Sequence, residues 1–257
     1  MTRKPEIRRQ NLLALLRAKR LHAMDEIMRE AGASPATTHR DLDALEARGL
    51  VRKTYGCVEV LDPGGVQVDF DRRVAENAVL KRALARAAVG MVQPGDAVFN
   101  DASSTCEFLL QEVASAGVAV TVATNSPEAA AMYRKQAGPL HLLVCGGRLD
   151  KELNAFVGPL ALAAVSHLHF RKAFVSGAGF SRVGGLSTTS EALQAMVRAV
   201  LSAAVERYCL ADSTKLNRDC LYKVAELGEF EVVFSNANMD PREARRLRQG
   251  GVNLRLV

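Results

Sequence analysis

The sequence lacks an apolar run of membrane-spanning length, and its charged amino terminus has no apolar segment of the kind that signal peptides carry. These absences predict a cytoplasmic protein with no membrane association. Cysteine is also scarce, and the five cysteines show no Cys-x-x-Cys spacing, so neither a disulfide framework nor a zinc site is indicated. His167 and His169 have no companion carboxylate or cysteine at ligand spacing, so we expect no metal and no cofactor.

Positive charge is concentrated near the amino terminus. The chain of 257 residues has a net charge of +6, and its first 60 residues carry 12 Lys and Arg against 8 Asp and Glu. Clustered basic charge of this kind gives affinity for phosphates without sequence specificity. The length leaves room for a small basic domain followed by a larger domain with its own buried core.

Residues 33–51 have the pattern of a DNA recognition helix that runs into a wing. Ser34 is expected to cap the helix with its hydroxyl, Pro35 suits the first helical position, and Gly49 is expected to end the helix. Three residues recur at the spacing of one helical face and are expected to pack inward: Thr38, Leu42 and Leu45.

Two further helices and a hairpin complete the pattern. A first helix carries an apolar stripe, a second helix over 24–31 stops at Gly32, and residues 50–60 resemble a short hairpin with its turn near Gly56. The stripe consists of Ile7, Leu12, Leu13, Leu15 and Leu16. The alternative is a small helical domain with a solvated basic face, which explains the charge but not the order of cap, turn, helix and hairpin.

DNA contacts are expected from the early part of the recognition helix, from the first helix and from the wing. The residue types there are small enough for close approach, or they can donate hydrogen bonds to base edges and phosphates. The expected partner is therefore operator DNA. The predicted DNA-binding residues are Arg9, Ser34, Ala36, Thr37, Thr38, His39, Arg40, Arg52 and Lys53.

These residues resemble the recognition helix of the DeoR family of bacterial repressors, which typically reads Val-Ser-x-x-Thr-Ile-Arg-Arg-Asp-Leu-x-x-Leu-x-x-x-Gly. Two departures bear on function: His39 replaces the first of the two arginines, and Cys57 replaces the second glycine of the family's wing. His39 affects the expected base preference, and Cys57 affects the expected geometry of the wing. The matching residues are Ser34, Thr37, Arg40, Asp41, Leu42, Leu45 and Gly49.

A turn-rich segment at 62–66 marks a boundary, after which short apolar strands alternate with helical stretches. This order implies a mostly parallel α/β sheet with helices on both faces. The expected strands are 97–99, 118–123, 140–144, 172–175, 208–211, 232–234 and 254–256. The expected helices are 70–92, 106–116, 127–136, 160–166, 191–206 and 242–249, the first with Val79, Leu80, Ala83, Leu84 and Ala87 on its apolar side.

Small polar residues collect where these strands end, which is where ligands bind in open α/β sheets. The loops at 101–105 and 124–126 each precede a helix, whose N-terminus attracts anions. Residues 145–147 add glycines that allow close approach of the backbone, and Lys215 adds a charge at another strand end. This convergence predicts a pocket for a phosphorylated small molecule. The predicted effector-binding residues are Asp101, Ser103, Ser104, Thr105, Thr124, Asn125, Ser126, Gly146, Gly147 and Lys215.

The same loops extend the resemblance to the DeoR family over nearly the whole chain, although Ser103 replaces a loop glycine and Arg171 replaces an acidic residue. The sensor domain of that family is similar in fold to ribose-5-phosphate isomerase and glucosamine-6-phosphate deaminase. The resemblance implies a winged helix-turn-helix over 1–60, a linker over 61–75 and a mostly parallel α/β sensor of ribose-5-phosphate isomerase-like type over 76–257. It further implies a homo-oligomeric repressor of carbohydrate or polyol catabolic genes, controlled by a phosphorylated sugar or polyol.

Two alternatives remain open. The chain could be a sugar-phosphate isomerase or deaminase fused to a DNA-binding segment, with Asp101 or Asp212 as the base. The deaminase relatives carry an Asp-Gly-His run after the glycine-rich strand end, whereas residues 177–184 contain neither Asp nor His, and the two aspartates are better suited to ordering loops. The chain could also be a DNA-binding architectural protein with a vestigial sensor.

Overall fold

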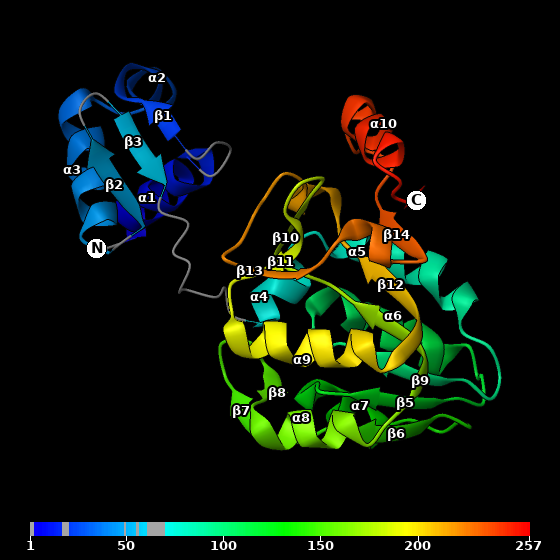
Figure 1. Cartoon of the computed structure of the whole chain (residues 1–257). Helices are drawn as coiled ribbons and strands as arrows, with labels where there is room; N and C mark the ends of the chain where they lie inside the picture. The colour runs from blue at the N-terminus through cyan, green and yellow to red at the C-terminus, as the bar shows by residue number, and fades with distance from the viewer. Residues whose placement is uncertain (1–2, 17–20, 49, 55–56, 61–69) are drawn as a thin grey trace. The chain divides into compact units, whose positions relative to one another are not determined.

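The computed structural model describes residues 3–16, 21–48, 50–54, 57–60 and 70–257 (Figure 1). The chain forms two compact units, Met1–Gln67 and Val68–Val257. Three predicted features lie outside the described residues: the helix end at Gly49, the turn at Gly56 and the boundary at 62–66. Of the predicted linker 61–75, the described part is helix α4 (Phe70–Ala75), whose Phe70 is buried.

The first unit has three helices and a small antiparallel sheet, as expected for a winged helix-turn-helix. Strand β3 pairs with both β1 and β2, so the predicted hairpin is confirmed, whereas the third strand β1 has no counterpart among the sequence predictions. The elements are α1 (Arg3–Leu16), β1 (Leu21–Ala23), α2 (Met24–Glu30), α3 (Pro35–Glu46), β2 (Val51–Thr54) and β3 (Cys57–Val60). Their common core consists of Leu12, Leu16, Ile27, Leu42, Leu45, Val51 and Val58.

Local chemistry explains where α3 starts. The Ser34 hydroxyl accepts a hydrogen bond from the Thr37 amide at 3.3 Å, and Pro35 occupies the first helical position. Gly32 adopts a left-handed φ of +59°, which suits the turn between α2 and α3. The predicted cap, first residue and turn are thereby confirmed.

The second unit is built on a seven-stranded, fully parallel sheet with the order β15-β14-β12-β9-β4-β5-β6 (Figure 1). Each predicted strand is present in it, so the predicted mostly parallel α/β fold is confirmed. The strands are β4 (Ala97–Asn100), β5 (Thr121–Thr124), β6 (His141–Val144), β9 (Phe170–Val175), β12 (Ala204–Leu210), β14 (Val232–Ser235) and β15 (Leu254–Leu256).

Helices cover both faces of this sheet. Leu84 of α5 (Ala78–Ala88), Leu109 of α6 (Ser104–Ser115) and Ala129 of α7 (Pro127–Tyr133) belong to one apolar cluster. A second cluster contains residues of α8 (Pro159–Ser166), α9 (Glu191–Ser202) and α10 (Pro241–Gln249). The two layers fix the sheet and leave the carboxyl ends of its strands to loops.

Three of the predicted helices are wrong in extent, and the simplest case is 127–136, which ends at Tyr133. The predicted helix 70–92 breaks at Asn77, whose φ of 55° is left-handed, and its last residues form a 3-10 turn at Val89–Met91. The predicted helix 191–206 ends at Ser202, because Ala204 already pairs with Phe170 in the sheet. Tertiary pairing here overrides helical propensity.

The predicted apolar side of the helix that begins after Asn77 is only partly right: Leu84 is buried as predicted, but Val79 is not. Val79 is 83% exposed, whereas Lys81 is only 4% exposed and lies on the same inner face as Leu84, Ala85 and Ala88. The face is therefore rotated, and a lysine stands where an apolar residue is usual.

Two small sheets lie beside the main one and were not predicted. They are the hairpin of β7 (Arg148–Asp150) with β8 (Ala155–Val157), and a sheet of β10 (Gly179–Ser181), β11 (Gly185–Thr188) and β13 (Tyr222–Ala225). Their strands are only three or four residues long, too short for a clear alternating pattern.

Candidate functional site

The exposed part of α3 presents most of the residues predicted to contact DNA. Ser34, Ala36, His39 and Arg40 are exposed, and Thr37 is half-buried. The Arg40 guanidinium folds along its own helix, where its Nε donates to the Ala36 carbonyl at 3.3 Å. The structure thus brings these five predicted residues to the exposed side of α3 and its N-terminus.

Thr38 is a correction to the predicted DNA-binding set. Its side chain is 1% exposed, and its hydroxyl donates to the Ser34 carbonyl at 3.2 Å. A residue buried in this way packs the helix, as its spacing with Leu42 and Leu45 indicated, and it cannot contact a base.

Besides Arg40, the predicted set contains three basic residues, and they differ in their surroundings. Arg52 is exposed on the wing. The Lys53 ammonium is hydrogen-bonded to Asp43, which raises the pKa of Lys53, and it lies 3.7 Å from Glu46. Arg9 donates to Asp41 at 3.1 Å. Acidic side chains of α3 therefore offset part of the basic charge of this unit.

In the second unit, the order of strands reverses between β4 and β9. Strands β4, β5 and β6 follow one another in one direction, and β9, β12, β14 and β15 follow in the other. Open α/β sheets bind ligands at the carboxyl ends of the strands beside such a reversal. The loops that begin at Asp101 and Ser176 lie at this point.

The loop after β4 leads into the N-terminus of α6. Ser103 caps this helix by accepting a hydrogen bond from the Cys106 amide at 3.2 Å, so its hydroxyl oxygen already has an internal partner. Ser104 and Thr105 form the first turn and are both buried. The positive end of a twelve-residue helix therefore points at the reversal.

The loop after β5 is held by its own side chains. Asn125 Oδ1 accepts from the Ala102 amide at 3.0 Å, and its Nδ2 donates to the Phe156 carbonyl at 3.3 Å. Thr124 accepts from the Ser126 amide at 3.1 Å, and Ser126 caps α7. These contacts brace the loop after β4, and a direct contact of the three residues with an effector stays a prediction.

The two predicted glycines after β6 have different reasons to be glycine. A Cβ on Gly147 would lie 2.8 Å from the Val157 carbonyl oxygen and 3.0 Å from Ala161 Cβ, so Gly147 is required for packing against α8. A Cβ on Gly146 would meet no atom within 4 Å. Close approach of a ligand therefore does not explain Gly147.

Two lysines meet near the reversal. Lys215 Nζ lies 3.2 Å from Ser176 Oγ and 3.8 Å from Asp212 Oδ2. Lys81 reaches the same region from α5, where its ammonium donates to the Arg73 carbonyl. Burial, followed by the positive charge of Lys215, lowers the pKa of Lys81 to about 8.

Unpartnered buried polar atoms gather at the same strand ends. Within the described ranges, four buried side-chain atoms have no hydrogen-bond partner: Asn100 Oδ1, Asp101 Oδ1, Thr105 Oγ1 and Asp212 Oδ2. Asn100 is the last residue of β4, Asp101 and Thr105 follow it, and Asp212 follows β12. Strands β4 and β12 lie on either side of β9 in the sheet. Burial raises the pKa of Asp101. Buried polar groups are rarely left unpaired, so this cluster indicates a place for a polar ligand.

Three residues of this site were missed by the sequence predictions: Lys81, Asn100 and Ser176. Asp212 was considered there only as a base or as a residue that orders its loop. Lys81 stands three, four and seven residues before Leu84, Ala85 and Ala88, which is the spacing of one helical face. A lysine inside such a stripe was the available signal. Ser176 had none beyond its place at a strand end.

In the part of the chain that the structure describes, no three His, Cys, Asp or Glu side chains come together as possible metal ligands. Nor does any helix in the same part have the length and apolar character needed to cross a membrane.

Comparison with known families matches both units. Residues 8–63 match the family described as DeoR-like helix-turn-helix domain, and residues 76–237 match the DeoR C terminal sensor domain. The second match alone spans more than half of the chain.

Individual relatives agree with these matches. The chain is 27% identical over 252 residues to a putative aga operon transcriptional repressor of Escherichia coli O157:H7, covering 97% of this chain and 93% of that one. It is 27% identical to the lactose phosphotransferase system repressor of Lactococcus lactis subsp. lactis, covering 94% and 95%. Among solved structures, ribose 5-phosphate isomerase a of Methanocaldococcus jannaschii shares 19% identity at a TM-score of 0.40, covering 55% of each chain.

Proposed function

Since this chain belongs to the DeoR family of DNA-binding transcriptional regulators, we propose that it represses genes of carbohydrate or polyol catabolism. In this proposal, a phosphorylated sugar or polyol controls its binding to operator DNA. Family membership places it among regulators, as predicted, and not among the isomerases and deaminases. The relatives named above include one that carries a sugar in its name, the lactose phosphotransferase system repressor.

The observation that carries the effector class is the mixture of groups at the reversal of strand order. Lys215, Lys81 and the N-terminus of α6 suit a phosphate, because charge-assisted donors and helix N-termini bind anions. Asp101 Oδ1 and Asp212 Oδ2 accept no hydrogen bond in the structure, so these carboxylate oxygens suit hydroxyl groups of a ligand. A phosphorylated sugar or polyol carries both kinds of group.

Operator recognition is assigned to the exposed face of α3, to Arg9 of α1 and to the wing. We take the contacting residues to be Arg9, Ser34, Ala36, Thr37, His39, Arg40, Arg52 and Lys53. One small winged helix buries too little surface for tight specific binding, so two copies of the chain are expected on an operator. The protein acts where the operator is, in the cytoplasm.

Effector control requires that the effector bind two states of the protein with different affinity. In this proposal, the state that holds a phosphorylated sugar at Lys81 and Lys215 has low affinity for DNA. The effector then releases the operator by shifting the population toward that state.

A thermal-shift screen tests the effector class. Phosphorylated sugars and polyols are compared with their unphosphorylated forms and with inorganic phosphate, each added to the full chain. A ligand of the folded state stabilises it by about 2.7 kcal/mol at a hundred times its Kd. We expect a raised Tm with at least one phosphorylated compound and none with its unphosphorylated form. Equal shifts with the two forms would contradict the proposed phosphate site.

Effector affinity is expected to depend on pH through Lys81. Its pKa of about 8 in the free protein must rise when a phosphate binds beside it, because the anion stabilises the charged ammonium. Affinity should therefore be greatest below pH 8 and should fall above it, by up to about tenfold for each pH unit. Calorimetric titration from pH 7 to 9.5 measures this fall. Lys81→Met should flatten the profile, whereas Lys135→Met, at an exposed lysine of the same unit, should leave it unchanged.

A further inference from the structure

One carboxylate of the DNA-binding unit, that of Asp41, is buried although it belongs to the recognition helix. Asp41 follows Arg40 directly in the recognition helix, yet its side chain is only 3% exposed. Arg8 and Arg9 of α1 bind it. We propose that Asp41 is a positioning residue for DNA recognition, which holds α3 against α1 through these two arginines and so orients the exposed face of α3.

The contacts are directional and come from two neighbouring arginines. Arg8 donates from Nε to Asp41 Oδ2 at 2.5 Å and from Nη2 to Oδ1 at 3.1 Å, and Arg9 donates from Nε to Oδ1 at 3.1 Å. The hydrogen bond from Arg8 is the main cause of the lowered pKa of Asp41. The carboxylate lies inside the unit, while the arginine side chains are 38% and 27% exposed.

Apolar packing alone would fix the recognition helix less exactly. Leu42 and Leu45 bury α3 in the core, but apolar contacts are not directional, so they tolerate small rotations of a helix. Paired N–H donors to a carboxylate hold both the rotation and the axial position. A rotation of α3 would move Ala36, His39 and Arg40 together relative to the bases.

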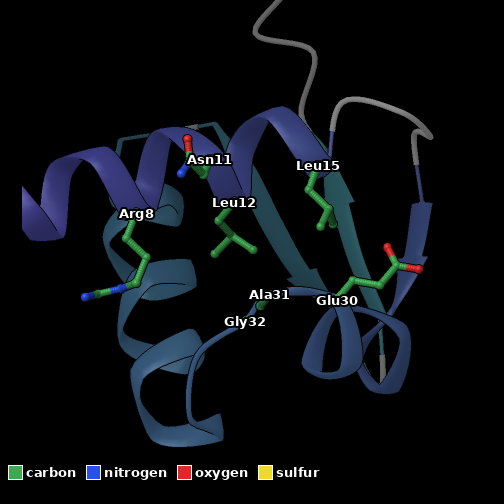
Figure 2. A pocket seen from close by; sticks show the side chains of 7 residues that line it. All are labelled: Arg8, Asn11, Leu12, Leu15, Glu30, Ala31 and Gly32. Atoms are coloured by element: carbon green, nitrogen blue, oxygen red, sulfur yellow. The ribbon is translucent and has the colours of Figure 1, made fainter.

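The surroundings of Arg8 leave much of the orientation of α3 to the ion pairs of Arg8 and Arg9 with Asp41. An open groove of about 340 Å³ lies between α1 and the turn that precedes α3, lined by Arg8, Leu12, Leu15 and Gly32 among others (Figure 2). Along this groove, α1 does not close on the turn. Arg8 extends from α1 at the rim of the groove, which makes it a link from α1 to α3 on that side.

The proposal predicts effects of opposite sign on two kinds of DNA. Removing an acidic charge makes the unit more positive, which by itself raises affinity for any duplex. Loss of helix orientation lowers affinity only for the duplex whose bases are read. A positioning role is therefore seen as a loss of discrimination, and a change of charge alone is not.

The test compares Asp41→Asn with Asp25→Asn in the full chain. Asp25 is an exposed acidic residue of α2 and provides the same change in charge away from the arginines. Affinity is measured for a duplex selected by the native chain from a random pool and for its scrambled sequence. Asp41→Asn is expected to reduce the ratio of the two affinities on the order of tenfold, with affinity for the scrambled duplex equal or higher. Asp25→Asn should keep the native ratio.

Further variants separate positioning from loss of the fold. Arg8→Lys keeps the charge, leaves α3 unchanged and removes the paired donors, so it should also lower the ratio. Asp41→Asn combined with Arg8→Lys should lose no more than the larger single effect, because both act through one contact. A native ratio in Asp41→Asn would overturn the proposal. A proportional loss of affinity for both duplexes would also overturn it, because that result describes a destabilised unit.

Discussion

Replacing Lys215 by alanine is expected to raise the concentration of phosphorylated effector needed to release DNA by about ten- to a hundredfold. The loss corresponds to one charge-assisted hydrogen bond to phosphate, worth roughly 1.5–3 kcal/mol. Lys215 lies at the reversal of strand order, 3.2 Å from Ser176 Oγ. DNA binding without effector should survive, because Lys215 belongs to the second compact unit and the recognition helix to the first.

The measurement is release of a labelled duplex from the full chain across a range of effector concentrations. Lys223→Ala is the matched control, since Lys223 is an exposed lysine paired with Glu226. Thr105→Val provides an independent test, because it removes a buried hydroxyl that has no partner. If Lys215→Ala and Thr105→Val both respond at native concentrations, the effector does not bind at this site.

Arg40→Ala is expected to weaken binding to a selected duplex and to relax its discrimination against other sequences. A bidentate contact between an arginine and a guanine provides on the order of 1–3 kcal/mol of discrimination. Arg40 is exposed on α3, and its Nε donates to the Ala36 carbonyl at 3.3 Å. Within the described residues no acidic side chain pairs with Arg40, so its side chain can turn from the helix toward a base without breaking an ion pair.

Arg29→Ala is a close control for this variant. Arg29 is an exposed arginine of α2 that donates in the same way to the carbonyl four residues earlier, that of Asp25, at 3.2 Å. Titrations of selected and scrambled duplexes at several salt concentrations separate base reading from phosphate contact. Arg29→Ala should at most weaken both duplexes alike. Equal weakening of both duplexes by Arg40→Ala would show that Arg40 contacts phosphate only.

The DNA-binding unit could be predicted closely because its signals are local. Ser34 and Pro35 define the start of α3 through the geometry of one helical turn, and Gly32 defines the preceding turn through a single backbone angle. Strand β1 was not predictable in this way, because its three residues become a strand only by pairing with β3. The burial of Asp41 likewise depends on arginines more than thirty residues away.

The ligand site could be predicted only in part, for a similar reason. The parallel sheet follows from the alternation of strands and helices, and its strand-end loops contain Asp101, Thr105 and Lys215. A helical lysine is ordinarily solvated, so the place of Lys81 in the stripe with Leu84 and Ala85 was a weak signal, and the packing of α5 shows that it is buried. The bracing role of Asn125 depends on Ala102 and Phe156, which no local pattern connects to it.

The break at Asn77 has a consequence for exchanging domains between family members. Near this break, the Arg73 carbonyl accepts a hydrogen bond from the Lys81 ammonium. The side-chain amide of Asn77 donates to the hydroxyl of Thr214, the residue before Lys215, at 3.3 Å. Helix α4 and the start of α5 thus help to hold Lys81 and the segment that precedes Lys215. A hybrid that joins another DNA-binding unit to this sensor must be spliced before Phe70, because a junction placed between 70 and 81 removes part of the ligand site. The DNA-binding unit is therefore the part that can be exchanged, whereas α4 and the start of α5 must be kept together with the sensor.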